Sequence, residues 1–325
     1  MVVSLKKSVP FVIKACPESK ISGNWLSGEI KESLKTLFDL DFNVRAVISD
    51  NHSTNVLAFK ILREEYGVED NKLSFNFNGN KVYNIYDSVH LLKNIRNNLL
   101  NTKRFIFPPF DFQFNLKDIV KSIHVDSGEI SWRLFHEVFE KDSLLPGNLR
   151  KAPKINAKTL HPGNNKQSVP LALNIFHETT ISAIKSYFTN ESAAAEFLNL
   201  INSWWVISNS KDKYNKNNRL GHAPVAGDGK PSFFLAFADW LKTWKEMQIS
   251  HCTKFSLSAQ TFDALITTLK GTASLTNDLF LEGYDYVLLS RLQTDPLEKH
   301  FGKYRQMSGG RFLVSLREVI NSEKY

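Results

Sequence analysis

Two carboxylates three residues apart, Asp295 and Glu298, begin a segment near the C-terminal end of the chain. A basic, aromatic and glycine-containing run follows them and includes Lys299, Lys303 and Arg305. Hard divalent cations such as Mg²⁺ take carboxylate oxygens and substrate phosphates as ligands, and the basic side chains would face the charge of a phosphate backbone. The segment therefore predicts chemistry at a phosphodiester.

Two further aspartates follow apolar runs that predict strands. Asp50 follows residues 44–48 after one serine, and Asp87 comes directly after residues 81–86. In open α/β sheets, functional groups gather just beyond the carboxyl ends of strands. The residues alone thus give Asp50, Asp87 and Glu298 as a candidate set for two-metal phosphoryl transfer.

Each of these carboxylates also has a structural interpretation. Asp50 precedes a predicted helix and suits a cap or turn, and Asp87 suits the cap of its own helix by accepting the amide of His90. Asp295 and Glu298 fit a capping box at the start of a helix. Taken by themselves, the residues leave both interpretations open.

The elements that must position these groups form an α/β pattern followed by a helical one. A strand at 10–14, a helix through 30–38, a strand at 44–48, a helix from 53 and a strand at 81–86 indicate a sheet with helices. From about 119 to 280 the chain is predicted mostly helical, and the main helical stretches are 130–139, 172–188, 192–206, 233–247 and 258–269. Residues 290–322 are predicted helical with a break at Gly309 and Gly310.

A basic stripe follows Asp87, because His90, Lys93 and Arg96 recur at three-residue intervals along the predicted helix. A helix N-terminus carrying such a stripe is suited to receive phosphate. His90 has no partner histidine at ligand spacing, so a surface or core histidine is favoured over a zinc ligand.

Composition narrows the class of protein. The chain has 325 residues with 42% hydrophobic content, enough for a large core and more than one domain. Its net charge of +8 favours a polyanionic partner. The two cysteines form neither a disulfide framework nor a zinc pattern, which fits the cytosol or nucleus. No run of some twenty apolar residues occurs, so no transmembrane helix and no membrane partner are expected.

Five blocks of the sequence together resemble one known family. They are residues 47–55, 87–97, 166–176, 192–210 and 294–302. The chain resembles the catalytic core of P-element-type DNA transposases, the family that includes the transposase-derived THAP-domain protein 9. The resemblance spans nearly the whole chain, and the blocks at 87–97 and 294–302 are specific in combination.

The resemblance implies an RNase H-like α/β fold, a mixed sheet flanked by helices, interrupted by a mainly helical GTP-binding insertion domain. The implied domains are 1–112, 113–282 and 283–325. The implied activity is Mg²⁺-dependent DNA cleavage and strand transfer in the nucleus, with transposon ends and target DNA as partners and a homo-oligomer as the assembly.

The resemblance also assigns roles to individual residues. Asp50 matches the second aspartate of the family's catalytic Asp, Asp, Glu set and Glu298 matches its glutamate, so both become the expected catalytic residues and metal ligands. Asp87 then becomes a structural or DNA-facing residue. The residues expected to bind the DNA backbone are His90, Lys93, Arg96, Lys303 and Arg305.

Two departures from the family pattern bear on activity. Lys166 matches a lysine associated with nucleotide phosphates and Asn209 matches a guanine-site residue, but Val206 stands where the family has a guanine-reading aspartate. Valine cannot accept the guanine N–H bonds, which puts GTP selectivity in question. The family's first catalytic aspartate is expected upstream of Val2, so impaired catalysis is expected for this chain. The alternative is a domesticated remnant that binds DNA or protein without chemistry.

Overall fold

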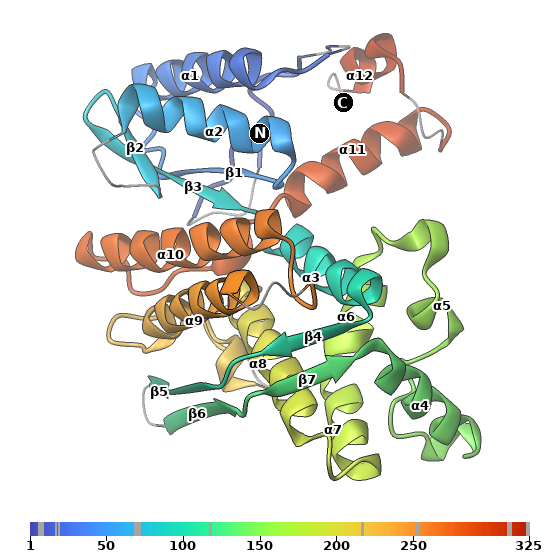
Figure 1. The fold of residues 1–325 in the computed structure, drawn as a ribbon. Coiled ribbons are helices and arrows are strands. Elements are labelled where there is room, and N and C mark those ends of the chain that lie inside the picture. Colours follow the sequence, from blue (N-terminus) through green and yellow to red (C-terminus); the bar gives the residue numbers. More distant parts are fainter. Residues whose placement is uncertain are drawn as a thin grey trace. The chain divides into compact units, whose positions relative to one another are not determined.

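The computed structural model describes residues 1–5, 10–16, 18, 20–67, 73–116, 119–215, 218–250, 254–310 and 314–322. The chain divides into two compact units (Figure 1). The first unit joins Met1–Asp87 to Arg291–Tyr325, and the second is Ser88–Ser290. These units begin and end at other residues than the predicted domains, whose assignment stays a prediction.

The first unit is built on a three-stranded sheet of order β1-β3-β2. Its strands are β1 (Ala46–Ser49), β2 (Ser74–Phe77) and β3 (Asn80–Tyr86). β1 and β3 run parallel, whereas β2 and β3 form an antiparallel hairpin. Asn78 and Gly79 make its turn with φ of 50° and 80°, the left-handed conformation that a two-residue hairpin requires. The strands predicted at 44–48 and 81–86 are therefore present.

Helices complete the first unit: α1 (Gly23–Asp39), α2 (Ser53–Tyr66), α11 (Asp295–Met307) and α12 (Leu316–Ser322). α1 and α2 lie side by side (Figure 1) and bury Leu34, Leu37, Phe59 and Leu62. The strand predicted at 10–14 is wrong, because the described residues there make only an isolated bridge between Val2 and Phe11.

The second unit combines two antiparallel strand pairs with most of the helices. β4 (Arg104–Phe107) pairs with β7 (Gly128–Ser131), and β5 (Phe110–Leu116) pairs with β6 (Ile119–Val125). Its helices are α3 (Ser88–Thr102), α4 (Trp132–Ser143), α5 (Ala157–Leu160), α6 (Val169–Phe176), α7 (Glu178–Tyr187), α8 (Ser192–Ser208), α9 (Lys230–Ser250) and α10 (Ala259–Leu281). Short 3₁₀ turns are η1 (Gly147–Leu149), η2 (Gly163–Asn165), η3 (Arg219–Gly221) and η4 (Leu289–Arg291).

The helical prediction fails at 119–131, where β6 and β7 lie. Apolar residues alternate with polar ones along β5, and only the apolar ones are mostly buried, which is the period of a strand with one covered face. Aromatic rings fill the core of this unit: Phe107 stacks on Phe197 at 4.7 Å. Trp244 donates its indole N–H to the carbonyl of Ile106 at 2.6 Å, which fixes the strand against α9. None of the helices described is both long enough and apolar enough to cross a membrane.

Candidate functional site

The carboxyl edge of the first unit's sheet brings two of the predicted aspartates together. β1 and β3 are parallel and in register, so that Ser49 lies beside Tyr86. Asp50 and Asp87 each follow these residues by one position, and the strands are roughly 4.8 Å apart. The amide of Asp87 still donates to the Ser49 carbonyl at 2.8 Å. Both carboxylates therefore leave the sheet at the same edge.

Helix α11 is tied to this edge through Asp87. The Asp87 carboxylate is fully buried, with 0% exposure. Its Oδ2 accepts hydrogen bonds from the backbone amide of Thr294, at 3.3 Å, and from the Thr294 hydroxyl. Since α11 begins at the next residue, Asp295, this contact joins the start of α11 to the end of β3.

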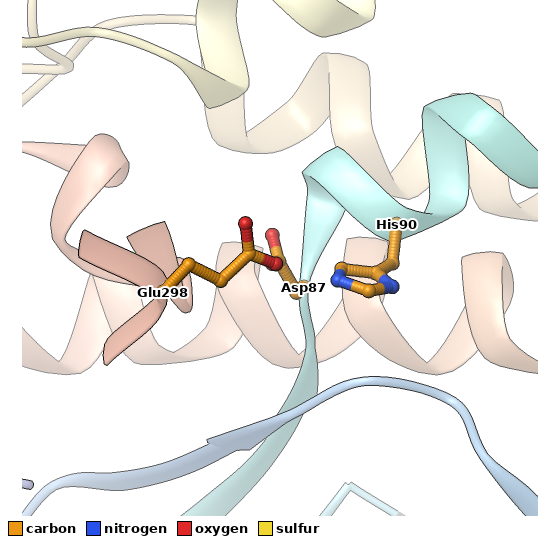
Figure 2. A group of neighbouring side chains, drawn as sticks. All are labelled: Asp87, His90 and Glu298. Atoms are coloured by element: carbon orange, nitrogen blue, oxygen red, sulfur yellow. The ribbon is translucent and has the colours of Figure 1, made fainter. Parts of the chain in front are cut away.

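Glu298 lies one turn into α11, and its carboxylate reaches toward Asp87 (Figure 2). A carboxylate oxygen of Glu298 lies within 4.8 Å of one of Asp87, and the Glu298 side chain is exposed. Figure 2 also draws His90, which follows Asp87 by three positions on the first turn of α3 and is part of the second unit. Within the first unit, Asp87 thus lies beside Glu298 and follows the strand that pairs with the strand before Asp50.

Asp50 is held by the turn that leads into α2. Its Oδ1 accepts the backbone amide of His52 at 2.9 Å and the side-chain amide of Asn55 at 2.6 Å. The imidazole Nδ1 of His52 then accepts the amide of Thr54 as the N-cap of the helix. The structural interpretation of Asp50 as a turn residue therefore has a geometric basis, and the same bonds fix the direction of its carboxylate.

The predicted basic residues fall into a buried group and an exposed group. On α3, Lys93 is 4% exposed and Arg96 is 0% exposed, whereas Lys303 and Arg305 on α11 are exposed. Burial lowers the pKa of the Arg96 guanidinium. Of these four residues, those on α11 present their charge to solvent.

Comparison with known proteins gives one relative in sequence. No family model matches the chain. The transposable element P transposase of Drosophila melanogaster is 24% identical over 292 residues, which cover 85% of this chain and 34% of that protein. The chain thus spans about a third of the length of the relative it matches.

A solved structure matches as well. The Drosophila P element transposase strand transfer complex superposes with a TM-score of 0.70 at 20% identity, covering 92% of this chain and 63% of that chain. The chain resembles P element transposases in sequence and in fold. The resemblance predicted from the five motif blocks is confirmed, and the mixed α/β architecture is that of the P element transposase structure.

The residues that the family resemblance assigns to a nucleotide site lie in the second unit. Lys166 is exposed, and its backbone carbonyl accepts hydrogen bonds from Arg96 Nη2 at 2.8 Å and from Asn97 Nδ2 at 3.3 Å. Asn209 is the C-cap of α8. Val206 lies in the last turn of α8 close to η3, since a Cβ built on Gly221 would be 3.4 Å from Val206 Cγ1.

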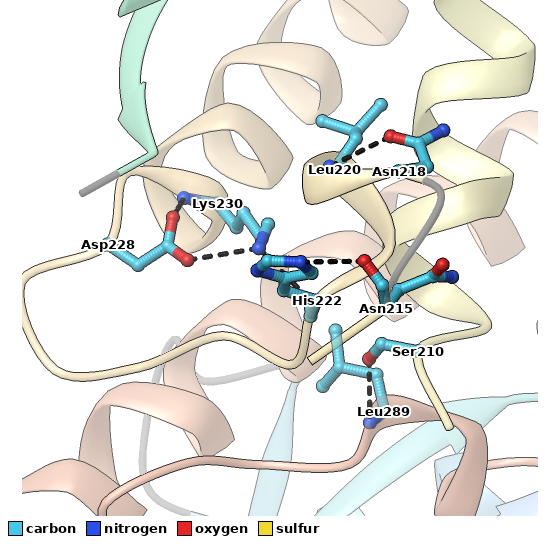
Figure 3. Close-up of polar contacts among 8 residues, drawn as sticks. All are labelled: Ser210, Asn215, Asn218, Leu220, His222, Asp228, Lys230 and Leu289. Carbon is cyan, nitrogen blue, oxygen red and sulfur yellow. Dashed lines mark hydrogen bonds and ion pairs between the residues drawn. The ribbon is translucent and has the colours of Figure 1, made fainter. Parts of the chain in front are cut away.

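Buried polar contacts hold the loop that follows α8 in this P element-like unit (Figure 3). The Lys230 ammonium pairs with Asp228 at 3.1 Å and donates to the His222 carbonyl at 2.9 Å. Both partners of the pair are almost fully buried, at 2% and 4% exposure. The imidazole of His222 bonds the Asn215 carbonyl at 2.9 Å. No spacing rule in the sequence indicates this pair.

Proposed function

We propose that this chain carries the catalytic core of a P element-like DNA transposase, which cleaves DNA and joins strands with Mg²⁺. In this proposal the first unit is RNase H-like, and the second unit contains the helical insertion predicted at 113–282. The observation that carries the proposal is the placement of Asp87, whose carboxylate lies within 4.8 Å of that of Glu298 and which leaves the sheet at the same end as Asp50. DNA as substrate, a nuclear location and a homo-oligomer follow from the same proposal.

The donor set fits a hard divalent cation. Carboxylate oxygens are the protein ligands that Mg²⁺ takes, with its remaining positions left to water and substrate phosphate. Asp50 and Glu298 would hold the ion, since Glu298 is exposed and Asp50 half-buried. When bound, such ions supply Lewis acidity at the phosphate and lower the pKa of water.

Asp87 has a different part in this arrangement. Because its carboxylate is buried and bonded to Thr294, it positions the start of α11 and thereby places Glu298. This agrees with the structural role that the family resemblance implies for Asp87. On α11 itself, Lys303 and Arg305 bind the DNA backbone, where each neutralised phosphate releases counterions.

For the second unit we propose phosphate contact by the exposed Lys166 without guanine selectivity. Val206 offers no acceptor to guanine, and η3 lies against it. Leaving the guanine N–H groups buried without an acceptor weakens the binding free energy by about 1–3 kcal/mol. Nucleotide binding, if measured by calorimetry, is then expected to show no preference for GTP over ATP.

The test is nicking of supercoiled plasmid by the purified chain with Mg²⁺. Impaired catalysis is expected for this chain, so we expect slow nicking by the wild type and a further fall in rate, on the order of 100-fold, for Asp50→Asn and Glu298→Gln, because each removes a charged metal ligand. Glu246→Gln, at an exposed position of α9, is the matched control and should not change the rate. Equal nicking by Glu298→Gln and wild type would refute the assignment.

One observation favours a second candidate function, a DNA-binding protein without chemistry. Two of the three carboxylates already serve structural hydrogen bonds, Asp50 to Asn55 and Asp87 to Thr294. This candidate predicts DNA binding that is salt-sensitive and indifferent to Mg²⁺ and to Asp50→Asn. Absence of nicking in every variant, with binding retained, would decide for it.

A further inference from the structure

Helix α11 exposes a large aromatic side chain one turn beyond Glu298. The Phe301 ring is 48% exposed, although Phe is a residue that folded proteins usually bury. One of its neighbours is the ring of Tyr304, at a centroid distance of 6.0 Å and an interplanar angle of 69°. Tyr304 is 4% exposed, so a buried ring supports Phe301 from one side while much of its surface faces solvent.

The surroundings of Phe301 on the helix are open and basic. A Cβ added at Gly302 would meet no other atom of the described residues within 4 Å, its chain neighbours and the helix backbone apart, so α11 is open at Gly302. Arg305 follows Phe301 by four positions, so it lies on the same side of α11, and it is exposed. The pattern combines an accessible aromatic ring with positive charge, which is how proteins bind unpaired nucleic-acid strands.

The spacing from Glu298 sets which part of a strand would meet the ring. One helical turn is about 5.4 Å, and one strand of a duplex advances about 3.4 Å per nucleotide. A phosphate beside Glu298 and a base on Phe301 would therefore belong to the same or adjacent nucleotides. Bases inside an intact duplex hide their faces, so stacking on Phe301 requires a base that has left the stack.

We propose that Phe301 is a stacking platform for an unpaired base next to the phosphate at Glu298. The first unit then takes frayed or single-stranded DNA ends in preference to intact duplex. This inference rests on the proposed function, since it assumes that DNA reaches Glu298. It makes Phe301 a specificity-determining residue of α11 that acts by stacking and not by charge or metal binding.

The experiment uses the whole chain with two DNA probes, a blunt duplex and a forked duplex with 2-aminopurine in the unpaired arm. Binding is followed by anisotropy and stacking by fluorescence quenching, both with Glu298→Gln so that no cleavage occurs. We expect quenching on the forked probe and an affinity on the order of tenfold above that for the blunt duplex.

The variants Phe301→Ala and Phe301→Leu, added to Glu298→Gln, should abolish the quenching and the preference for the fork, because leucine keeps the apolar volume but has no π face. Met307→Ala is the control, since Met307 is an apolar residue of the same helix at 54% exposure and should leave both readouts unchanged. A circular dichroism spectrum confirms that each variant is folded.

The outcomes separate the inference from the proposed function. Binding of both probes with quenching that survives Phe301→Ala would overturn the stacking role and leave DNA binding intact. Failure of the parent protein to bind either probe would overturn the proposed function and the inference with it. Quenching that is lost in both Phe301 variants and kept in Met307→Ala supports the inference.

Discussion

At the scale of single residues, Asp87 links the end of β3 to the start of α11. It is buried, accepts two hydrogen bonds from Thr294 and lies within 4.8 Å of Glu298. Burying a carboxylate destabilises the folded state unless the carboxylate is hydrogen-bonded. Thr294, the residue before α11, donates both hydrogen bonds to Asp87. The position of Glu298 therefore depends on a residue far from it in sequence.

This dependence gives a prediction for Thr294→Val, which removes the hydroxyl donor but keeps the shape of the side chain and the Asp87 carboxylate. We expect a loss of about 1–3 kcal/mol in the free energy of unfolding, measured by urea denaturation. Nicking should fall together with stability if Asp87 acts by positioning α11.

A matched variant distinguishes positioning from metal binding. Thr54→Val changes a threonine at the start of α2, whose bond to the His52 cap uses only its backbone amide, so the variant's unfolding free energy and nicking should change little. Full nicking by Thr294→Val, with nicking lost in Asp87→Asn, would show instead that Asp87 is itself a metal ligand.

At the scale of elements, the β2–β3 hairpin aligns the central strand of the sheet. Gly79 has φ of 80°, and a Cβ there would meet nothing within 4 Å. A side chain at Gly79 would therefore destabilise the fold only through backbone strain at this positive φ, and not through a steric clash. The register of β3 decides on which side of the sheet its residues lie, and β3 ends at Asp87.

A pair of glycine substitutions tests this at the same scale. Gly79→Ala should lower the free energy of unfolding by about 1 kcal/mol, because an L residue is strained at that φ. Gly28→Ala should raise it by roughly 0.5–1 kcal/mol, because Gly28 lies exposed inside α1 with open space around it. Urea midpoints measure both, and equal signs would contradict the argument.

At the scale of the whole molecule, the proposed binding of DNA depends on charge. The net charge is +8. The exposed residues Lys303 and Arg305 lie one to two turns beyond Glu298 on α11. The logarithm of the non-specific affinity for DNA falls linearly with the logarithm of the salt concentration. The steepness of this fall is proportional to the number of phosphates that the protein neutralises. The chain should therefore bind DNA of any sequence more weakly as salt is raised.

The prediction is specific to α11. Lys303→Gln should weaken binding to all DNA sequences alike and lower the slope against log salt by about 1. Lys158→Gln, at an exposed position of α5, serves as the control of equal charge change and should leave the slope unchanged. Fluorescence anisotropy across a salt series measures both, and equal slopes for wild type and Lys303→Gln would rule out a phosphate contact there.

The limits of prediction from sequence are visible in particular elements. The strands before Asp50 and Asp87 were predicted because their apolar runs are short and end at polar residues. β6 and β7 were missed because short segments cannot be assigned to strand or helix by periodicity alone, although the β-branched residues of β6 favour a strand. The pairings that stabilise them, β5 with β6 and β4 with β7, are made with other segments of the chain.

The residue types at the strand ends and helix starts are evident from the sequence alone, and the motif blocks indicate the resemblance to P element transposases. Three features depend on tertiary packing. Asp87 accepts a hydrogen bond from Thr294, 207 positions away in the chain; Asp50 and Asp87 lie at the same end of the sheet; and Phe301 faces solvent. The physical reason is that local propensity acts over a few neighbouring residues, whereas strand register and burial are set by packing between segments remote in sequence.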